Sequence, residues 1–165
     1  MDIKRILRHL AITQWQVNRA FPRTTLSAIE KAIKTSETAH LGEVRFVVEG
    51  ALDGAPLFNG QSARERAIDL FSHLRMWDTE QKSGVLIYLL LADRQVEIVA
   101  DRGIDAKAGL REWKAVCHDM EVAFKAANYE QGAVCGIEAV TRQLTAHFPA
   151  GVGNCNELPD QPVVL

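Results

Sequence analysis

The sequence predicts one α/β domain built around a β-hairpin. Residues 85–91 are apolar at nearly every position, which is typical of a strand covered on both faces of a sheet. After a polar break at residues 92–95, apolar side chains recur at every second position of residues 96–100, and two strands joined so briefly must pair antiparallel. Helical spacing of apolar residues over 110–124 and 129–144 then predicts two long helices that cover the sheet.

A helix and a strand open the domain. The helix begins at Thr24 or Thr25, either of which can act as its N-cap. A capping box of Ser27 and Glu30 offers an alternative start. In residues 43–48, Val44, Phe46 and Val48 alternate with Glu43, Arg45 and Val47, which is the two-residue period of a strand.

A second helix lies between this strand and the hairpin. Residues 49–60 contain three glycines and a proline, so we expect a loop there. Ser62 and Glu65 form a capping box that starts a helix, and this helix ends near residues 76–77. Helices and strands therefore alternate along the chain, as in other α/β proteins.

Two segments flank the domain of residues 23–148. In residues 1–22, apolar side chains recur at helical spacing with basic side chains between them, which predicts a basic amphipathic helix ending before Pro22. Residues 149–165 contain three prolines and no periodicity. We expect them to form an extended or mobile tail.

Length and composition agree with a single domain without cross-links. A chain of 165 residues can bury about two thirds of its unfolded surface. The three cysteines, Cys117, Cys135 and Cys155, lack the spacing of a disulfide framework or a zinc site, although a bridge between the first two remains an alternative. The longest apolar run is far shorter than the roughly 20 residues of a membrane-spanning helix, and no secretory signal is recognised. We therefore expect a cytoplasmic protein.

Charge is distributed unevenly along the chain. Residues 1–25 hold five basic residues and one acidic residue, a net charge of +4, so the remaining residues carry −6. An acidic body argues against nucleic acid as a partner, because duplex binding needs a basic face. The apolar side of the helix in residues 1–22 has three alternative neighbours: the domain's own core, a protein partner, or an anionic membrane surface at which the chain would be peripheral.

A set of short motifs runs in order through the centre of the chain. They are Trp77-Asp78, Gly84-Val85-Leu86-Ile87-Tyr88, Asp93-Arg94, Val96-Glu97-Ile98-Val99 and Gly103-Ile104. In order and spacing these motifs, with the helices around them, resemble the TPM domain over residues 25–148. That family is named after a thylakoid lumen protein, a photosystem II associated protein and a receptor modulator.

The resemblance implies a compact α/β sandwich, in which a central mixed β-sheet containing the hairpin has helices on both faces. Many relatives carry an export signal and a transmembrane helix, whereas this sequence is similar to a short bacterial-type member without a signal peptide. Residues 1–22 are then the membrane-facing candidate of a cytoplasmic, membrane-peripheral protein. Divalent-cation binding and phosphatase activity have been ascribed to some members of the family.

Acidic side chains gather at the open end of the hairpin. Because a hairpin reverses direction, Asp78 and Glu80 before its first strand lie at the same end as the loop that leaves its second strand. That exit loop contains Asp101 and Asp105. Carboxylate oxygens suit calcium or magnesium, and Arg102 in the same loop can contact a phosphate or another ligand. The alternative is that these acidic residues cap the next helix or pair with Arg102.

Two classes of function remain. The first is a non-enzymatic binding or assembly module that recognises a protein partner and binds a divalent cation. The second is a divalent-metal-dependent phosphatase that hydrolyses phosphomonoesters with metal-activated water. The sequence lacks the cysteine-arginine phosphatase loop, the P-loop, and the Asp-x-Asp and Arg-His-Gly patterns. We therefore favour the binding module.

Overall fold

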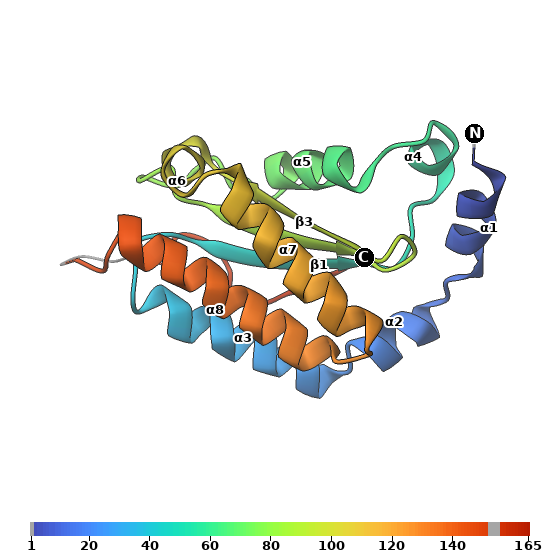
Figure 1. Cartoon of the computed structure of the whole chain (residues 1–165), viewed down its shortest axis with the longest axis horizontal. Helices are drawn as coiled ribbons and strands as arrows, with labels where there is room; N and C mark the ends of the chain where they lie inside the picture. The colour runs from blue at the N-terminus through green and yellow to red at the C-terminus, as the bar shows by residue number, and fades with distance from the viewer. Residues whose placement is uncertain (1, 152–155) are drawn as a thin grey trace.

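A mixed β-sheet runs through the centre of the computed structural model, which describes residues 2–151 and 156–165 (Figure 1). Within these residues the sheet has four strands in the order β3-β2-β1-β4. The strands are β1 (Val44–Glu49), β2 (Val85–Leu90), β3 (Gln95–Ala100) and β4 (Val163–Val164). β1 runs parallel to β2 and to β4, whereas β2 and β3 form the predicted antiparallel hairpin. The predicted mixed sheet is confirmed.

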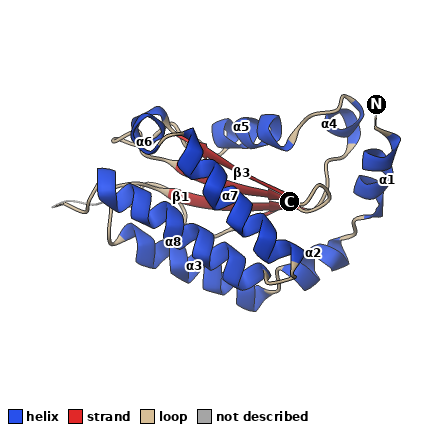
Figure 2. Cartoon of the chain, in the orientation of Figure 1, coloured by secondary structure: helices blue, strands red, loops and turns tan. Residues whose placement is uncertain are grey.

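Helices cover both faces of this sheet, as predicted (Figure 2). One face is covered by α3 (Arg23–Glu37), α7 (Leu110–Lys125) and α8 (Tyr129–His147), and the other by α5 (Ala63–His73). Four shorter helices complete the described part of the chain: α1 (Ile3–Ala11), α2 (Gln14–Ala20), α4 (Gly54–Phe58) and α6 (Arg102–Ala108). None of the described helices combines the length and the apolar character that a membrane crossing requires.

The central strand β2 is buried on both faces. Its first, third and fifth side chains join the apolar core beneath α3, α7 and α8: Val85, Ile87 and Leu89. The alternate side chains join the core beneath α5: Leu86, Tyr88 and Leu90. Because successive side chains of a strand point to opposite faces, an uninterrupted apolar run is what a doubly covered strand needs.

One partly buried ion pair joins the sheet to α5. Arg66 of α5 donates two hydrogen bonds to the carboxylate of Glu49 in β1, with Nε–Oε2 and Nη2–Oε1 distances of 2.9 and 2.8 Å. The hydroxyl of Tyr88 in β2 donates to the same carboxylate at 2.6 Å. Burial is the main cause that raises the pKa of Tyr88, so it remains a donor. The three side chains therefore satisfy one another between two strands and a helix.

The N-terminal segment forms two helices, so the single helix predicted for residues 1–22 is wrong in this respect. α1 ends at Ala11 and α2 begins at Gln14. The break lies at a capping box, in which the Thr13 backbone N–H donates to Oε1 of Gln16 at 2.8 Å. Apolar residues continue at helical spacing on both sides of this box, which hides the break from a periodicity argument.

The tail predicted for residues 149–165 ends as part of the sheet. Val163 and Val164 pair with Val47 and Val48 of β1, and the Leu165 N–H donates to the Val48 carbonyl at 2.9 Å. A strand of two residues is too short to leave a period in the sequence. Residues 152–155 of the predicted tail, which include Cys155, lie outside the described residues.

The two described cysteines are free thiols, so the alternative bridge between Cys117 and Cys135 is not formed. Burial raises the pKa of the Cys117 thiol to about 12, which keeps it protonated and unreactive. Cys135 is exposed on α8.

We expect Arg66→Ala to lower the free energy of unfolding by about 3 kcal/mol, because the Glu49 carboxylate then stays buried without its cation. Urea unfolding of the purified chain measures this loss. Lys31→Ala is the control, since Lys31 is exposed on α3 and forms no ion pair among the described residues, and its urea midpoint should equal that of the wild type. Equal midpoints for Arg66→Ala and the wild type would contradict a stabilising role for the partly buried pair.

Candidate functional site

The open end of the hairpin lies where β2 begins and β3 ends, and sequence analysis places the candidate site there. Val85 at the start of β2 pairs with Ala100 at the end of β3, so the residues before β2 and after β3 meet there. The Asp101 N–H donates to the carbonyl of Gly84 at 2.8 Å, which closes this end. We call the predicted set at this end the acidic edge: Asp78, Glu80, Asp101, Arg102 and Asp105.

Two glycines of the TPM-like motifs let the backbone segments of this edge approach one another. A Cβ atom on Gly84 would press against the carbonyl of Met76, and one on Gly103 against the carbonyl of Lys82. The Gly103 N–H donates to the same Lys82 carbonyl at 3.0 Å. Glycine is needed at both positions because there is no room for a side chain.

Asp101 is buried and forms the N-cap of α6. Its Oδ1 accepts a hydrogen bond from the Arg102 N–H at 2.7 Å. Its Oδ2 is buried without a hydrogen-bond partner among the described residues. The predicted exit loop is thus a helix start, and helix capping, the alternative interpretation of this residue, is observed.

The other residues of the acidic edge have separate surroundings. Oδ1 of Asp105 accepts a hydrogen bond from the indole Nε1 of Trp113 at 3.1 Å. Asp78 and Glu80 are exposed, and the Glu80 N–H donates to the carboxylate of Glu157 at 3.3 Å. The carboxylates of Asp101 and Asp105 thus have separate hydrogen-bond donors, while Asp78 and Glu80 are exposed.

A calcium or magnesium ion at the acidic edge stays a prediction. Within residues 2–151 and 156–165, no three histidine, cysteine, aspartate or glutamate side chains are arranged so that they could hold a metal ion. The described residues also contain no ion pair of Arg102 with a carboxylate. Oδ2 of Asp101 is the carboxylate oxygen of this set that is buried without a hydrogen-bond partner among the described residues.

Sequence analysis missed a second acidic group beside this edge. It lines a cavity of about 370 Å³ between the end of α3, the start of β1 and the C-terminal tail. We call it the acidic pocket; it is lined by Lys34, Glu37, Thr38, Glu43, Ala150, Gly151, Asn156 and Asp160. Its carboxylates come from segments far apart in the sequence, so no local spacing reveals them.

The acidic pocket holds the tail against the sheet. The carboxylate of Glu43 accepts hydrogen bonds from the backbone N–H groups of Glu157 at 3.0 Å and Leu158 at 3.3 Å. Arg45 of β1 donates from Nη1 to the carbonyl of Pro159, while its Nε is buried without a partner in the described residues. Glu43 just before β1 and Arg45 within it thus fix the segment that leads into β4.

Burial changes the proton affinity of this pocket. It is the main cause that raises the pKa of Glu37 to about 9; the Val44 N–H opposes this effect, and the nearby Glu43 and Asp160 carboxylates add to it. Burial likewise raises the pKa of Glu43, against the two backbone donors of the tail. Glu37 therefore carries its proton at neutral pH and shares a hydrogen bond with Asp160.

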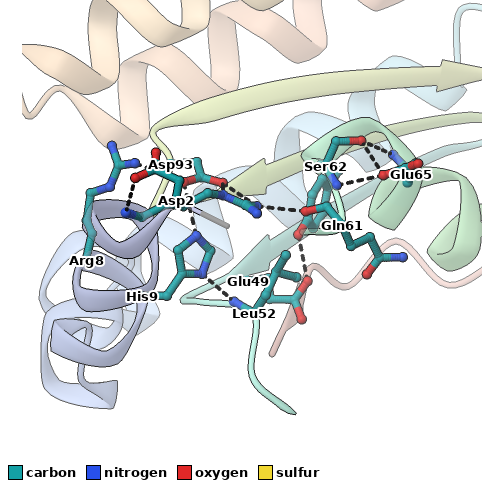
Figure 3. A network of polar contacts seen from close by, with 11 residues as sticks. Asp2, Arg8, His9, Glu49, Leu52, Gln61, Ser62, Glu65 and Asp93 are labelled. Atoms are coloured by element: carbon teal, nitrogen blue, oxygen red, sulfur yellow. Dashed lines mark hydrogen bonds and ion pairs between the residues drawn. The ribbon is translucent and has the colours of Figure 1, made fainter. Parts of the chain in front are cut away.

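The opposite end of the hairpin anchors α1. Figure 3 shows Arg8 and His9 directed at Asp93, which lies in the turn between β2 and β3. Arg5 donates from Nε to Oδ2 of Asp93 at 2.9 Å and from Nη2 to the carbonyl of Gln61 at 2.8 Å. Burial by itself would raise the pKa of Asp93, but the hydrogen bonds from Arg5 and His9 outweigh it and lower that pKa.

His9 connects this anchor to the loop after β1. The backbone N–H of Leu52 donates to Nδ1 of His9 at 2.9 Å, so the hydrogen-bond pattern assigns the ring proton to Nε2. Nε2 lies 3.0 Å from Oδ1 of Asp93 and donates to it. The ring is fully enclosed, at 2% exposure. The charged side of α1 is therefore bonded into the domain.

Most of the apolar side of α1 faces away from the domain, while Ile6 at its border packs against the core beneath α5. Ile3, Leu7 and Leu10 recur at a spacing of four and three residues, which places them on one side of the helix. Their side chains are 65%, 61% and 66% exposed. We call these three residues the α1 face. Trp15 of α2, five residues further on, is 64% exposed.

The motifs, the hairpin and the sheet order agree with a family match. A family model described as the TPM domain matches residues 18–143. The chain belongs to the TPM domain family. A search of curated proteins found no match.

Two solved structures have the same TPM-like fold. The BA42 protein of the psychrophilic bacterium Bizionia argentinensis, solved by NMR, is 30% identical, with a TM-score of 0.74 over 86% of this chain and 93% of that one. The N-terminal domain of a P. gingivalis protein, also solved by NMR, is 17% identical, with a TM-score of 0.61 over 76% and 77%. The second likeness shows the fold alone.

The TPM domain model covers the acidic edge but does not reach α1. The acidic edge lies within the matched residues 18–143, whereas α1 and the described tail from residue 156 lie outside them. The α1 face is therefore an addition to the part of the chain that matches the TPM domain model.

We expect Glu37→Gln to make stability less dependent on pH. The folded chain binds more protons than the unfolded chain between the ordinary pKa of 4.5 and the raised pKa of about 9. The stability that Glu37 contributes is thus complete below 4.5 and is lost as the pH rises through about 9, at no more than about 1.4 kcal/mol per pH unit. A glutamine keeps the acceptor for the Val44 N–H and does not ionise.

Urea unfolding of wild type and variant across this pH range measures the difference. The wild type should lose stability as the pH rises, and the Glu37→Gln variant should lose less. Glu30→Gln on the same helix is the control and should follow the wild type. A wild type that gains stability between pH 6 and 9 to the same extent as the variant would contradict a protonated Glu37.

Proposed function

We propose that this TPM-domain chain is a non-enzymatic binding and assembly module that docks through the α1 face. One observation carries the proposal: the charged side of α1 is bonded to the domain, and the three apolar residues of the α1 face are exposed. A surface helix usually has the reverse orientation, because burial of apolar surface is favourable.

The exposure of the α1 face is costly unless something covers it. Each of Ile3, Leu7 and Leu10 would gain about 1.5–3 kcal/mol on full burial. Exposed apolar patches bordered by polar residues are typical of interaction sites on soluble proteins. The bonds to Asp93 hold this patch outward, so a partner meets a helix that is already folded and oriented. We also propose that the protein is cytoplasmic and that it binds peripherally at a membrane.

We expect Leu7→Gln with Leu10→Gln to abolish assembly without unfolding the chain. In density-gradient sedimentation of lysate from cells that express the full chain, the wild type should move with heavier material. The double variant should sediment at the mass of a monomer, because glutamine removes the apolar contact at two positions. Both side chains are exposed, so the urea midpoint should not change.

Leu110→Gln is the matched control, since Leu110 is 59% exposed at the start of α7. This variant should sediment like the wild type. A wild type that sediments as a monomer in the lysate would contradict the proposed function. So would a Leu110→Gln variant that loses assembly as completely as the double variant, because the α1 face would then have no special role.

A divalent-metal-dependent phosphatase is the second candidate. Oδ2 of Asp101 favours it, because this oxygen is buried without a hydrogen-bond partner among the described residues and a carboxylate oxygen can bind a cation. Asp105 and the exposed Asp78 and Glu80 are the other proposed ligands, and Arg102 is the proposed phosphate contact. A bound calcium or magnesium ion would supply Lewis-acid activation of a water molecule.

A thermal melt with calcium or magnesium tests this candidate. If the ion binds at the acidic edge, it should raise the Tm of the wild type and leave that of Asp101→Asn with Asp105→Asn unchanged, because both carboxylates are lost. Asp119→Asn, at an exposed position on α7, is the control and should respond like the wild type. Magnesium-dependent hydrolysis of p-nitrophenyl phosphate that the double variant loses would replace the binding module with the phosphatase.

A further inference from the structure

The side chains around the α1 face indicate which kind of partner it takes. Lys4 is exposed, and the Arg8 side chain is 52% exposed despite its ion pair with Asp93. On α2, the guanidinium carbon of Arg19 lies 5.3 Å from the ring centroid of Trp15. Apolar residues bordered by lysine, arginine and tryptophan are the composition of helices that lie in a bilayer interface.

We propose that the α1 face docks on the surface of an anionic lipid bilayer, with α1 lying along that surface. The inference rests on the proposed function, because it names the partner of the same docking surface. Figure 1 shows α1 at an outer corner of the molecule, where no other described helix lies over its outward side. A protruding helix can lie flat on a bilayer. Its exposed apolar residues then enter the lipid surface while its basic side chains contact the headgroups.

The charge of the rest of the chain sets the direction of approach. Residues 1–25 carry a net charge of +4, and the remaining residues carry −6. An anionic surface attracts the lysine and arginine side chains of the N-terminal corner and repels the acidic body. The chain therefore meets the bilayer with α1 first, and salt weakens the attraction because it screens both charges.

The anchor at Asp93 makes this docking element rigid. A helix of nine residues is marginal by itself in water, and two sets of bonds support α1. Oδ1 of Asp2 caps it by accepting from the Lys4 and Arg5 N–H groups, and Asp93 accepts from Arg5 and His9. Binding then needs little ordering of the chain. Asp93 is thus a positioning residue that keeps the α1 face outward.

Docking through α1 also orients the acidic edge. Asp93 lies at the turn between β2 and β3, and Asp101 follows the far end of β3. A strand of six residues spans about 20 Å. With α1 on the lipid, the acidic edge points away from the bilayer into water, where a cation or a soluble partner can reach it.

Co-sedimentation of the purified full chain with lipid vesicles tests the inference. Vesicles of phosphatidylcholine with phosphatidylglycerol should pellet the wild type with at least about tenfold higher affinity than vesicles of phosphatidylcholine alone, because two or more basic residues contribute. Leu7→Gln with Leu10→Gln should lower the affinity for the anionic vesicles by at least about tenfold. Raising the salt concentration should weaken the binding of the wild type.

Two further variants separate the parts of the argument. Leu110→Gln, the matched exposed leucine on α7, should bind anionic vesicles like the wild type. Asp93→Ala keeps the α1 face but removes its anchor, so hydrogen exchange of α1 in the free protein should become faster. Circular dichroism and the urea midpoint check that the leucine variants remain folded.

The outcomes distinguish the lipid partner from the docking function. Assembly in lysate that depends on Leu7 and Leu10, together with no binding of the purified chain to anionic vesicles, would refute the lipid partner and leave the docking function in place. Equal binding to neutral and anionic vesicles would refute the charge argument. If the wild type neither assembles in lysate nor binds vesicles, both proposals are wrong. Unchanged hydrogen exchange of α1 in Asp93→Ala would refute its positioning role.

Discussion

The structure depends on the burial of β2 on both faces. Its six side chains alternate between two apolar cores, so the strand is stable only when helices cover the sheet from both sides. α3, α7 and α8 meet this need on one face and α5 on the other. The polar groups that this arrangement encloses, such as Glu49, are tolerated because Arg66 and Tyr88 satisfy them.

The same hairpin separates two surfaces at opposite ends of the molecule. The turn end carries Asp93, whose carboxylate gathers the charged side of α1 and leaves the α1 face exposed. The open end carries Asp101 and the start of α6, close to the acidic pocket that holds the tail. A chain attached through α1 would therefore keep its acidic edge free, which makes attachment and ligand binding compatible.

The candidate site was predictable only where it depends on local geometry. That a hairpin returns Asp101 to the end where Asp78 enters follows from chain reversal, and the register of β2 and β3 agrees with it. The surroundings of those side chains did not follow, because the helix cap at Asp101 and the Trp113 contact of Asp105 arise from the packing of α6 and α7. The N-terminal helix was also predictable, apart from its break at Thr13.

By itself, the sequence determined the α/β class, the hairpin and the amphipathic character of α1, because each depends on the period of neighbouring residues. The TPM motifs were found by their resemblance to the family in order and spacing. Only the tertiary structure decided which side of α1 is buried. Periodicity shows that a helix has two unlike sides, but Asp93 and Leu52, distant in sequence, select the charged side. The acidic pocket likewise exists only because β4 brings Asp160 to Glu37, since long-range pairing leaves no local pattern.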